Sequence, residues 1–283
     1  MERIALPTTK LYFDQDMARA ECHPFADGAA AVYSSRCPGR AAANEDAAAL
    51  IPFTTGSGVL AVADGLGGAV AGDHAACLAI QALRTSIEEG RQQETMLRTA
   101  ILNGIEAANQ SVQALGGGAA TTLAAVEVQG DTIRPYHVGD SMILVVGLRG
   151  KIKLKTVSHS PVGFAVEAGL FDQGEAMYHE DRHLVSNVIG SVEMKIEIGP
   201  TLRMAARDSV LLASDGLFDN LHVEEIVERL RKGPLEGATQ RLVEDARRRM
   251  TQTDDRLPSK PDDLTFVVFR RASPRHNPAT GSP

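Results

Sequence analysis

Residues 59–68 read VLAVADGLGG, which is a short aliphatic run followed by an aspartate and then by glycines. An uninterrupted apolar run of this length, bounded by turn residues, is typical of a buried β-strand. The carboxylate of Asp64 is therefore expected at the end of a buried strand. Residues 210–216, VLLASDG, have the same arrangement and place Asp215 after an apolar run of their own.

Two more aspartates occupy similar positions. Asp140 follows one apolar run and Asp262 precedes another, while the triplet 44–46, Asn-Glu-Asp, adds a further acidic point. An aspartate beside a glycine, taken alone, is better explained as ordinary turn chemistry. Taken together, these positions predict a cluster of carboxylates at the ends of buried strands.

A cluster of carboxylates at strand ends predicts a site for divalent cations. Carboxylates that lie close together repel one another, and their pKa values rise unless a cation neutralises them. Mg²⁺ and Mn²⁺ suit such a site because hard cations prefer carboxylate, carbonyl and water oxygens. The backbone carbonyl of Gly65 carries no side-chain bulk beside it and is a further candidate ligand.

A site with two such cations predicts a chemistry as well. A pair of ions can bind one bridging water, lower its pKa and screen the oxygens of a phosphate ester. Phosphate monoesters hydrolyse very slowly without a catalyst, so they need electrostatic stabilisation of this size. The expected activity is hydrolysis of a phosphate ester.

The remaining pattern predicts an α+β fold. Strands are expected at 29–33, 59–63, 122–128, 133–137, 142–146, 152–157, 210–213 and 264–269, and helices at 73–89, 94–115, 223–231 and 235–251. The helices come in pairs between runs of consecutive strands. This order favours largely antiparallel sheets over the regular alternation of a parallel sheet. Since no repeat or linker is visible, we expect an irregular N-terminal extension at 1–28, one catalytic domain at 29–271 and a disordered tail at 272–283.

Composition excludes several classes of protein. The chain has 283 residues, 43% of them apolar, and a net charge of −7, so it lacks the basic balance of a nucleic-acid-binding protein. Three cysteines without a CxxC spacing predict neither a disulfide framework nor a thiolate zinc site. With no signal peptide and no apolar run long enough to span a bilayer, we expect a cytoplasmic protein that does not contact the membrane.

The order of the motifs resembles the protein phosphatase 2C family, the metal-dependent serine/threonine phosphatases. The similar segments span residues 40 to 270 and are NEDA (44–47), VADGLGG (62–68), GAATT (118–122), VGDS (138–141), SHS (158–160), LASDGLFD (212–219) and DDLTFVV (262–268). Each motif is weak alone, whereas the whole set in this order is specific.

The resemblance implies a fold, a ligand set and a function. The fold would be a four-layer αββα sandwich of two antiparallel sheets flanked by helix pairs. The resemblance assigns Glu45, Asp64 and the Gly65 carbonyl to one Mn²⁺ or Mg²⁺ ion. It assigns Asp64, Asp215 and Asp262 to a second ion, with Asp46 acting through bound water. Asp140 and Asp219 would hold a third, weaker ion. Residues 161–182 would form a flap that helps to choose substrates. The implied activity is hydrolysis of phosphoserine and phosphothreonine in proteins, opposing a Ser/Thr kinase.

The chain departs from the family pattern at three places. Arg40 lies five residues before Glu45, one more than the usual phosphate-binding arginine, so Arg40 is the candidate and Arg36 the reserve. Leu66 stands where many eukaryotic members have a histidine, which indicates a bacterial-type member in which metal-bound water protonates the leaving group. Met142 replaces the arginine that commonly follows the Gly-Asp-Ser motif.

Other interpretations of the same residues are weaker. The segment 179–183, HEDRH, satisfies the HExxH pattern of zinc peptidases, but it is short, polar and set between glycines. The glycines after Asp64 lack the spacing of a nucleotide-binding loop. Neither Ser214 nor His159 lies in a nucleophile elbow, and His74 is expected to be a helix-face residue rather than a ligand. The main alternative is a catalytically inactive 2C-like binding or regulatory module.

Overall fold

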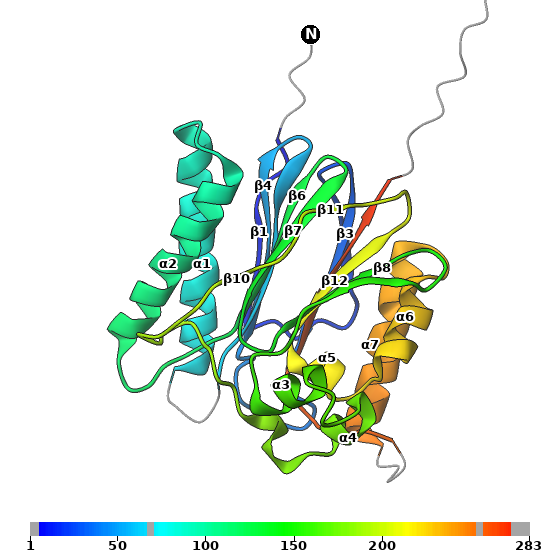
Figure 1. Cartoon of the computed structure of the whole chain (residues 1–283). Helices are drawn as coiled ribbons and strands as arrows, with labels where there is room; N and C mark the ends of the chain where they lie inside the picture. Colours follow the sequence, from blue (N-terminus) through cyan, green and yellow to red (C-terminus); the bar gives the residue numbers. More distant parts are fainter. Residues whose placement is uncertain (1–5, 67–70, 253–256, 273–283) are drawn as a thin grey trace, which may run out of the picture.

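The computed structural model describes residues 6–66, 71–252 and 257–272, which form two antiparallel β-sheets (Figure 1). The first sheet has the order β1 (Lys10–Phe13), β4 (Asp46–Thr54), β5 (Ser57–Asp64), β6 (Leu123–Gln129), β7 (Thr132–Val138) and β10 (Glu197–Ile198), with β11 (Leu202–Arg203) also paired to β7. The second has the order β2 (Glu21–Phe25), β3 (Gly28–Ser35), β13 (Leu264–Arg271), β12 (Ser209–Ala213), β8 (Met142–Val146) and β9 (Ile152–Lys155).

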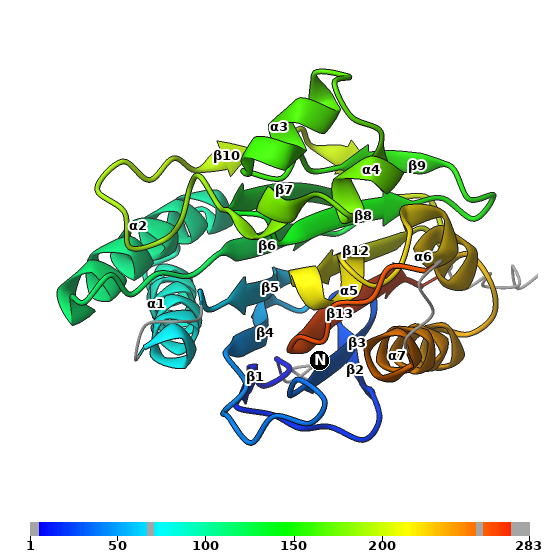
Figure 2. The same cartoon turned by 90° about the horizontal axis from the view of Figure 1, so that it is seen from below.

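Two pairs of helices cover the outer faces of these sheets. Helices α1 (Gly72–Gln92) and α2 (Leu97–Leu115) pack on the first sheet, and α6 (Val223–Leu230) and α7 (Leu235–Thr251) pack on the second. Figure 2 shows the four layers from one end of the molecule. The predicted four-layer αββα sandwich of antiparallel sheets is confirmed, and the four predicted helices lie where expected to within a few residues.

Strand alternation divides the buried side chains among three cores. In β4, Ala47 and Ala49 face the α1–α2 layer, while Ala48 and Leu50 face the other sheet. The strands of the second sheet alternate in the same way between the inter-sheet core and the core under α6 and α7. Because successive residues of a strand point to opposite faces, a sheet buried on both sides has no polar face. This explains why the central strands are mostly apolar.

Several elements were not predicted. Residues 10–13 and 21–25 form the strands β1 and β2, so the expectation of an irregular segment before residue 29 was wrong for these two stretches. Strand β4 was missed because its sequence, DAAALIPFT, is rich in alanine and contains a proline, and neither residue type is typical of strands. Most of the predicted tail, residues 273–283, lies outside the described residues.

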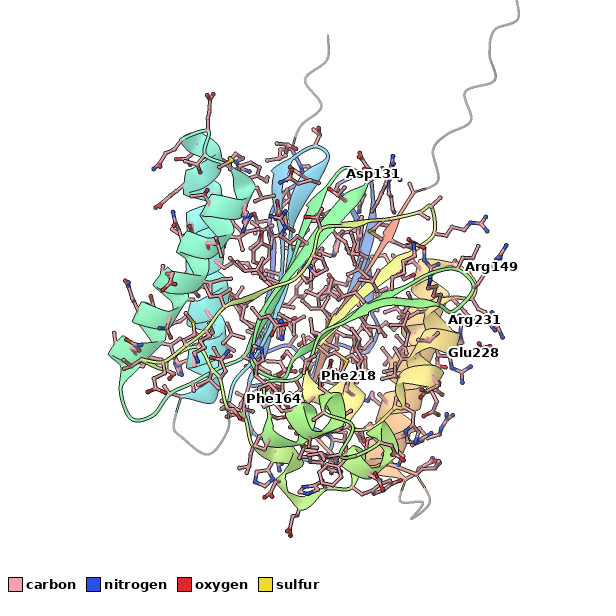
Figure 3. The ribbon with its side chains drawn as sticks, in the orientation of Figure 1. Asp131, Arg149, Phe164, Phe218, Glu228 and Arg231 are labelled. Atoms are coloured by element: carbon pink, nitrogen blue, oxygen red, sulfur yellow. The ribbon has the colours of Figure 1, made fainter. Side chains whose placement is uncertain are left out.

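Three short helices gather at one end of the sandwich. They are α3 (Pro161–Glu167), α4 (Gln173–Met177) and α5 (Asp215–Phe218). Figure 3 shows Phe164 of α3 and Phe218 of α5 at this end, with Asp131 in the β6–β7 turn at the other. Within the described ranges, no helix combines the length and the apolar character needed to cross a membrane.

Candidate metal centre

The end of the sandwich that carries α3, α4 and α5 also collects the ends of four strands. Strand β4 begins at Asp46, and its antiparallel neighbour β5 ends at Asp64, so that these two residues are direct cross-strand partners. In the second sheet β12 ends and β13 begins at this same end. Antiparallel pairing therefore brings together residues 45–46, 64–65, 214–219 and 262–263.

Both backbone polar groups of Asp64 have hydrogen-bond partners in the protein, so its carboxylate is not needed to satisfy them and can bind a cation. Its N–H donates to Thr122 Oγ1 at 3.0 Å, and its carbonyl accepts from Thr121 Oγ1 at 2.8 Å. The neighbouring carboxylate of Asp46 is buried and accepts a hydrogen bond from the Ser214 hydroxyl at 2.8 Å. The GAATT motif thus fixes the position of Asp64, and the LASDG motif fixes that of Asp46.

Close backbone packing places Glu45 and Gly65 side by side. The Gly65 N–H donates to the Glu45 carbonyl at 3.1 Å. A Cβ on Gly65 would lie 2.1 Å from the carbonyl oxygen of Gly72, so only glycine fits there. Asp263, which the sequence analysis left out of the site, accepts the N–H groups of Cys37 and Glu45, each at 2.7 Å. Asp263 therefore ties the start of β13 to the loop before β4.

Helix α5 supplies two further acids. The Asp219 N–H donates to the Asp215 carbonyl at 2.7 Å, so both aspartates belong to one helical turn. A Cβ on Gly216 would lie 1.9 Å from the carbonyl oxygen of Asp263. The glycine after Asp215 thus allows α5 to pack directly on the start of β13, next to Asp262.

A lysine that the sequence analysis missed lies among these acids. Lys260 Nζ is 2.5 Å from Asp215 Oδ2, 2.9 Å from Asp219 Oδ2 and 3.1 Å from Asp262 Oδ2. No family motif contained this residue, and lysine is not a ligand for a hard cation. Only the position of its side chain shows its connection with the site.

The surroundings of the acids favour their neutral forms in the absence of added cations. Burial raises the pKa of Asp64 well above its usual range, and the charges of Asp46 and Asp215 raise it further. Burial and then the charge of Asp215 raise the pKa of Asp140 to about 7 and that of Asp219 to about 6. In the described part of the chain, neither Asp64 nor Asp140 has an ion-pair partner. This donor set, made only of oxygens and short of positive charge, fits Mg²⁺ or Mn²⁺.

The SHS motif positions Asp140. The Gly139 N–H donates to His159 Nδ1 at 3.1 Å, and the His159 N–H donates to the Gly139 carbonyl at 3.0 Å. These two bonds hold the turn between β7 and β8 that carries Asp140. The hydroxyl of Ser160 accepts the Gly163 N–H at 2.9 Å and caps α3.

His159 also belongs to a group that superficially looks like a second metal site. His137, His159 and Glu197 have ligand atoms within 4.8 Å of one another. However, His159 Nδ1 accepts the Gly139 N–H, so its Nε2 carries the proton and donates to Glu197 at 3.0 Å. His137 Nε2 likewise donates, to the Val157 carbonyl at 3.0 Å. Both facing nitrogens carry protons, so this group is a hydrogen-bonded support for the turn.

The two candidate arginines differ in their freedom to bind a phosphate. Arg36 Nη2 is 2.8 Å from Asp14 Oδ1, so that side chain is already paired. Arg40 is exposed in the turn after Cys37. Burial raises the pKa of Glu45, and the positive charge of Arg40 opposes this shift, which places Arg40 near the acids. The geometry thus keeps Arg40 as the candidate.

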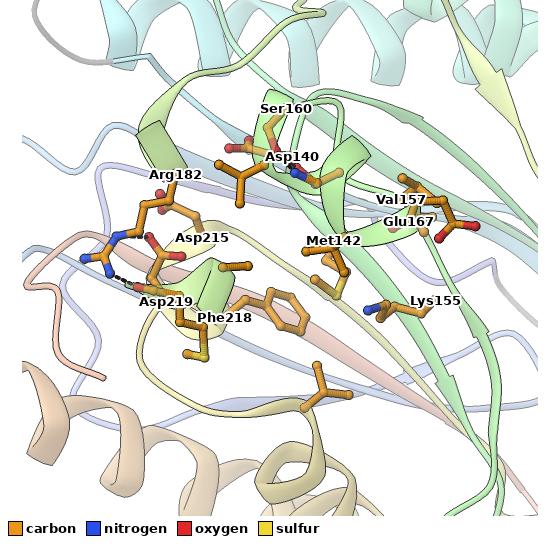
Figure 4. A pocket seen from close by; sticks show the side chains of 18 of the residues that line it. Asp140, Met142, Lys155, Val157, Ser160, Glu167, Arg182, Asp215, Phe218 and Asp219 are labelled. Carbon is orange, nitrogen blue, oxygen red and sulfur yellow. Dashed lines mark hydrogen bonds and ion pairs between the residues drawn. The ribbon is translucent and has the colours of Figure 1, made fainter. Parts of the chain in front are cut away.

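A cavity of about 160 Å³ adjoins the acids (Figure 4). Asp140, Asp215 and Asp219 line one part of it, and Met142 and Phe218 are among the apolar residues that line the rest. Helices α3 and α4, which belong to the predicted flap, form one wall. Figure 4 also shows Arg182, whose Nε lies 3.8 Å from Asp219 Oδ2 and so connects the flap to α5.

The weaker interpretations find no support in the geometry. Residues 180–183 of the HExxH segment form one turn of 3₁₀-helix. His179 Nδ1 accepts the Asp181 N–H, and His183 Nδ1 donates to the Glu180 carbonyl. Ser214 donates to Asp46 rather than to a histidine base. His74 lies in the first turn of α1, on a helix as expected, and its side chain is exposed.

Comparison with known proteins assigns the chain to a family. A family model described as Protein phosphatase 2C matches residues 35–252. The chain belongs to this family, which confirms the resemblance seen in its motifs. It is 32% identical over 220 residues to the serine/threonine protein phosphatase PstP of Mycobacterium tuberculosis; the match covers 75% of this chain and 40% of PstP. The chain therefore spans less than half the length of that relative.

Solved structures agree with the fold. A serine/threonine phosphatase of S. agalactiae superposes with a TM-score of 0.73 at 27% identity, over 85% of this chain and 98% of that one. The catalytic domain of PstP, in complex with two manganese ions, superposes with a TM-score of 0.66 at 27% identity, over 86% of this chain and 98% of that one.

Proposed function

We propose that this protein is a phosphatase that hydrolyses phosphoserine and phosphothreonine in proteins with Mn²⁺ or Mg²⁺. The observation that supports it most is the meeting of six predicted ligand side chains at one end of the sandwich, those of Glu45, Asp64, Asp140, Asp215, Asp219 and Asp262. When bound, the cations supply a water of lowered pKa and positive charge to screen the phosphate. Family membership and the manganese complex of the related catalytic domain support the same function.

The residues of the site would have separate roles in binding the cations, the water and the phosphate. Glu45, Asp64 and the Gly65 carbonyl would hold one cation, and Asp64, Asp215 and Asp262 a second. Asp46, buried and bonded to Ser214, would orient water from behind these ligands. Arg40, exposed in the turn after Cys37, would bind the phosphate oxygens of the substrate. Leu66 has no proton to give, so the leaving oxygen must take its proton from water.

The flap would contribute the choice of substrate. The cavity of about 160 Å³ lies between the flap helices and α5 and opens next to the acids. A cavity of about 150 Å³ holds an apolar group the size of benzene. The cavity therefore suits one apolar side chain of a phosphoprotein, close to the phosphorylated residue. The natural counterpart of such an enzyme is a Ser/Thr protein kinase.

The test is hydrolysis of p-nitrophenyl phosphate and of a phosphothreonine peptide while Mn²⁺ is added and then removed with EDTA. We expect activity that requires Mn²⁺ and falls at least about 1,000-fold in Asp64→Ala, because this carboxylate would help to hold both cations. Asp131→Asn, at the opposite end of the sandwich, is the matched control and should keep full activity. A fully active Asp64→Ala variant would exclude the proposed centre.

The same experiment tests the inactive-module alternative. A pseudoenzyme would lack activity on both substrates. Calorimetric titration then separates two cases: a protein that does not bind Mn²⁺ is an inactive module, and one that binds Mn²⁺ retains the centre without turnover. The complete set Glu45, Asp64, Asp215 and Asp262 favours the active enzyme.

A further inference from the structure

Lys260 is the only lysine in the described part of the chain that contacts the predicted metal ligands. Its ammonium group is within 3.1 Å of one oxygen from each of Asp215, Asp219 and Asp262. Its side chain is only 23% exposed. The ammonium therefore lies inside the acidic cluster rather than at its surface.

The backbone of Lys260 is held in place, so this position is a built feature of the fold. The Lys260 N–H donates to Asn220 Oδ1 at 2.9 Å, and Asn220 Nδ2 donates to the Lys260 carbonyl at 2.8 Å. Asn220 is fully buried and also donates to the carbonyl of Gly216 in α5. One side chain thus fixes Lys260 to the helix that carries Asp215 and Asp219.

Charge is distributed unevenly over the acids. Asp219 has two cations from the chain itself, Lys260 at 2.9 Å and Arg182 at 3.8 Å. Asp140, the other acid expected to hold a third cation, has none among the described residues. Asp262 already accepts the Asp263 N–H at 3.0 Å on Oδ1 and the ammonium on Oδ2. The second cation would have three carboxylates, those of Asp64, Asp215 and Asp262, against the single ammonium. A third cation held by Asp140 and Asp219 would have only two carboxylates against both Lys260 and Arg182.

We propose that Lys260 is a resident cation of this centre, which takes the place of a third divalent ion beside Asp219 and limits the site to two. The inference rests on the proposed function only in that the cluster binds divalent cations. Repulsion between the ammonium and a nearby divalent ion would lower the affinity for that ion.

The test is calorimetric titration of the full chain with Mn²⁺ alone, without any phosphorylated substrate. The wild-type protein should bind two ions. Lys260→Met, which keeps an unbranched side chain one atom shorter and removes its charge, should bind a third ion or bind the weakest ion at least about tenfold more tightly. Lys260→Arg keeps the charge and should retain the wild-type stoichiometry.

Lys232→Met is the matched control, because Lys232 forms an ion pair with Glu228 on the surface of α6, where its side chain is 58% exposed. It should titrate as the wild type does. If Lys260→Met does not fold in EDTA, Lys260→Gln is titrated instead and judged by the same criterion. A charge-free variant with the stoichiometry and Kd of the wild type would overturn the proposal. Because binding is measured directly, a wild-type protein without phosphatase activity would refute the function and leave this test valid.

Discussion

Asp263 acts on the site through the backbone rather than through a cation. Its two carboxylate oxygens accept the N–H groups of Cys37 and Glu45, each at 2.7 Å. These bonds connect segments more than 200 residues apart in sequence. The position of Glu45 therefore depends on Asp263, which holds the Glu45 backbone next to the centre.

Replacing Asp263 with alanine should destabilise the protein and weaken metal binding together. The substitution leaves two partly buried N–H groups without an acceptor, which costs about 2–3 kcal/mol in the free energy of unfolding. The displaced loop also misplaces Glu45, so the Kd for Mn²⁺ should rise. Urea unfolding and calorimetry measure the two effects, with Asp131→Asn as the control. Unfolding free energy and Kd both equal to those of the wild type would contradict this role.

The extent to which the site followed from sequence also differs from residue to residue. Asp64 and Asp215 were predictable because an acid after a buried strand is visible as a local pattern. Lys260 was not predictable, because its contacts arise from the packing of the segment just before β13 against α5, and no sequence periodicity indicates that contact. His159 was found as part of a motif, but its role in holding Gly139 needed the tautomer that the hydrogen bonds define.

At the scale of elements, small residues decide how closely neighbours approach. Ala47 and Ala49 of β4 meet Ala75, Ala76 and Ala79 of α1 in one core, so this helix lies close to its sheet. Apart from β4, the central strands and the long helices were predictable from apolar runs and helical spacing. The four-residue helix α5 was not, because a single turn has no periodicity and is stabilised by its packing on β13.

The flap gives a prediction that separates substrate choice from chemistry. Val166 of α3 lines the cavity beside the acids, and tryptophan at this position would fill it. We expect Val166→Trp to raise the KM for a phosphoprotein about tenfold or more and to leave kcat for p-nitrophenyl phosphate unchanged, because that substrate has no side chain to place there.

Leu170→Trp is the matched control for this experiment, since Leu170 follows α3, is 73% exposed and does not line the cavity. Its KM for the phosphoprotein should stay at the wild-type value. Equal effects of the two substitutions on KM would show that the cavity does not take a substrate side chain.

At the scale of the whole molecule, the acids make stability depend on pH when no cation is bound. The pKa of Asp140 is raised to about 7 and that of Asp219 to about 6 by burial and by nearby carboxylates. A carboxyl group with a raised pKa in the folded state binds its proton more tightly there than in the unfolded chain. Its contribution to stability is complete below the unfolded pKa of about 3.9 and is lost as the pH rises through the folded value.

In EDTA, the melting temperature should therefore fall as the pH rises from 5 to 8, most steeply up to about pH 6 and levelling off above about 7. In saturating Mn²⁺ this loss should be much smaller, because the cations neutralise the ionised carboxylates. Thermal unfolding in the two buffers gives the comparison. A metal-free protein whose melting temperature rises over this interval would contradict the arrangement of charges described above.

The order of strands in the second sheet has a consequence for how the protein is made. Strand β13 is the last strand in sequence among the described residues, yet it lies between β3 and β12, and Ser34 bonds to Thr265 across 231 positions of the chain. During synthesis, β3 cannot pair with β13 until nearly the entire polypeptide has been made. Asp262 leaves the ribosome just before that partner. A chain interrupted before residue 262 therefore lacks both the centre of a sheet and a predicted ligand, so the proposed metal centre cannot be complete until synthesis has passed this point.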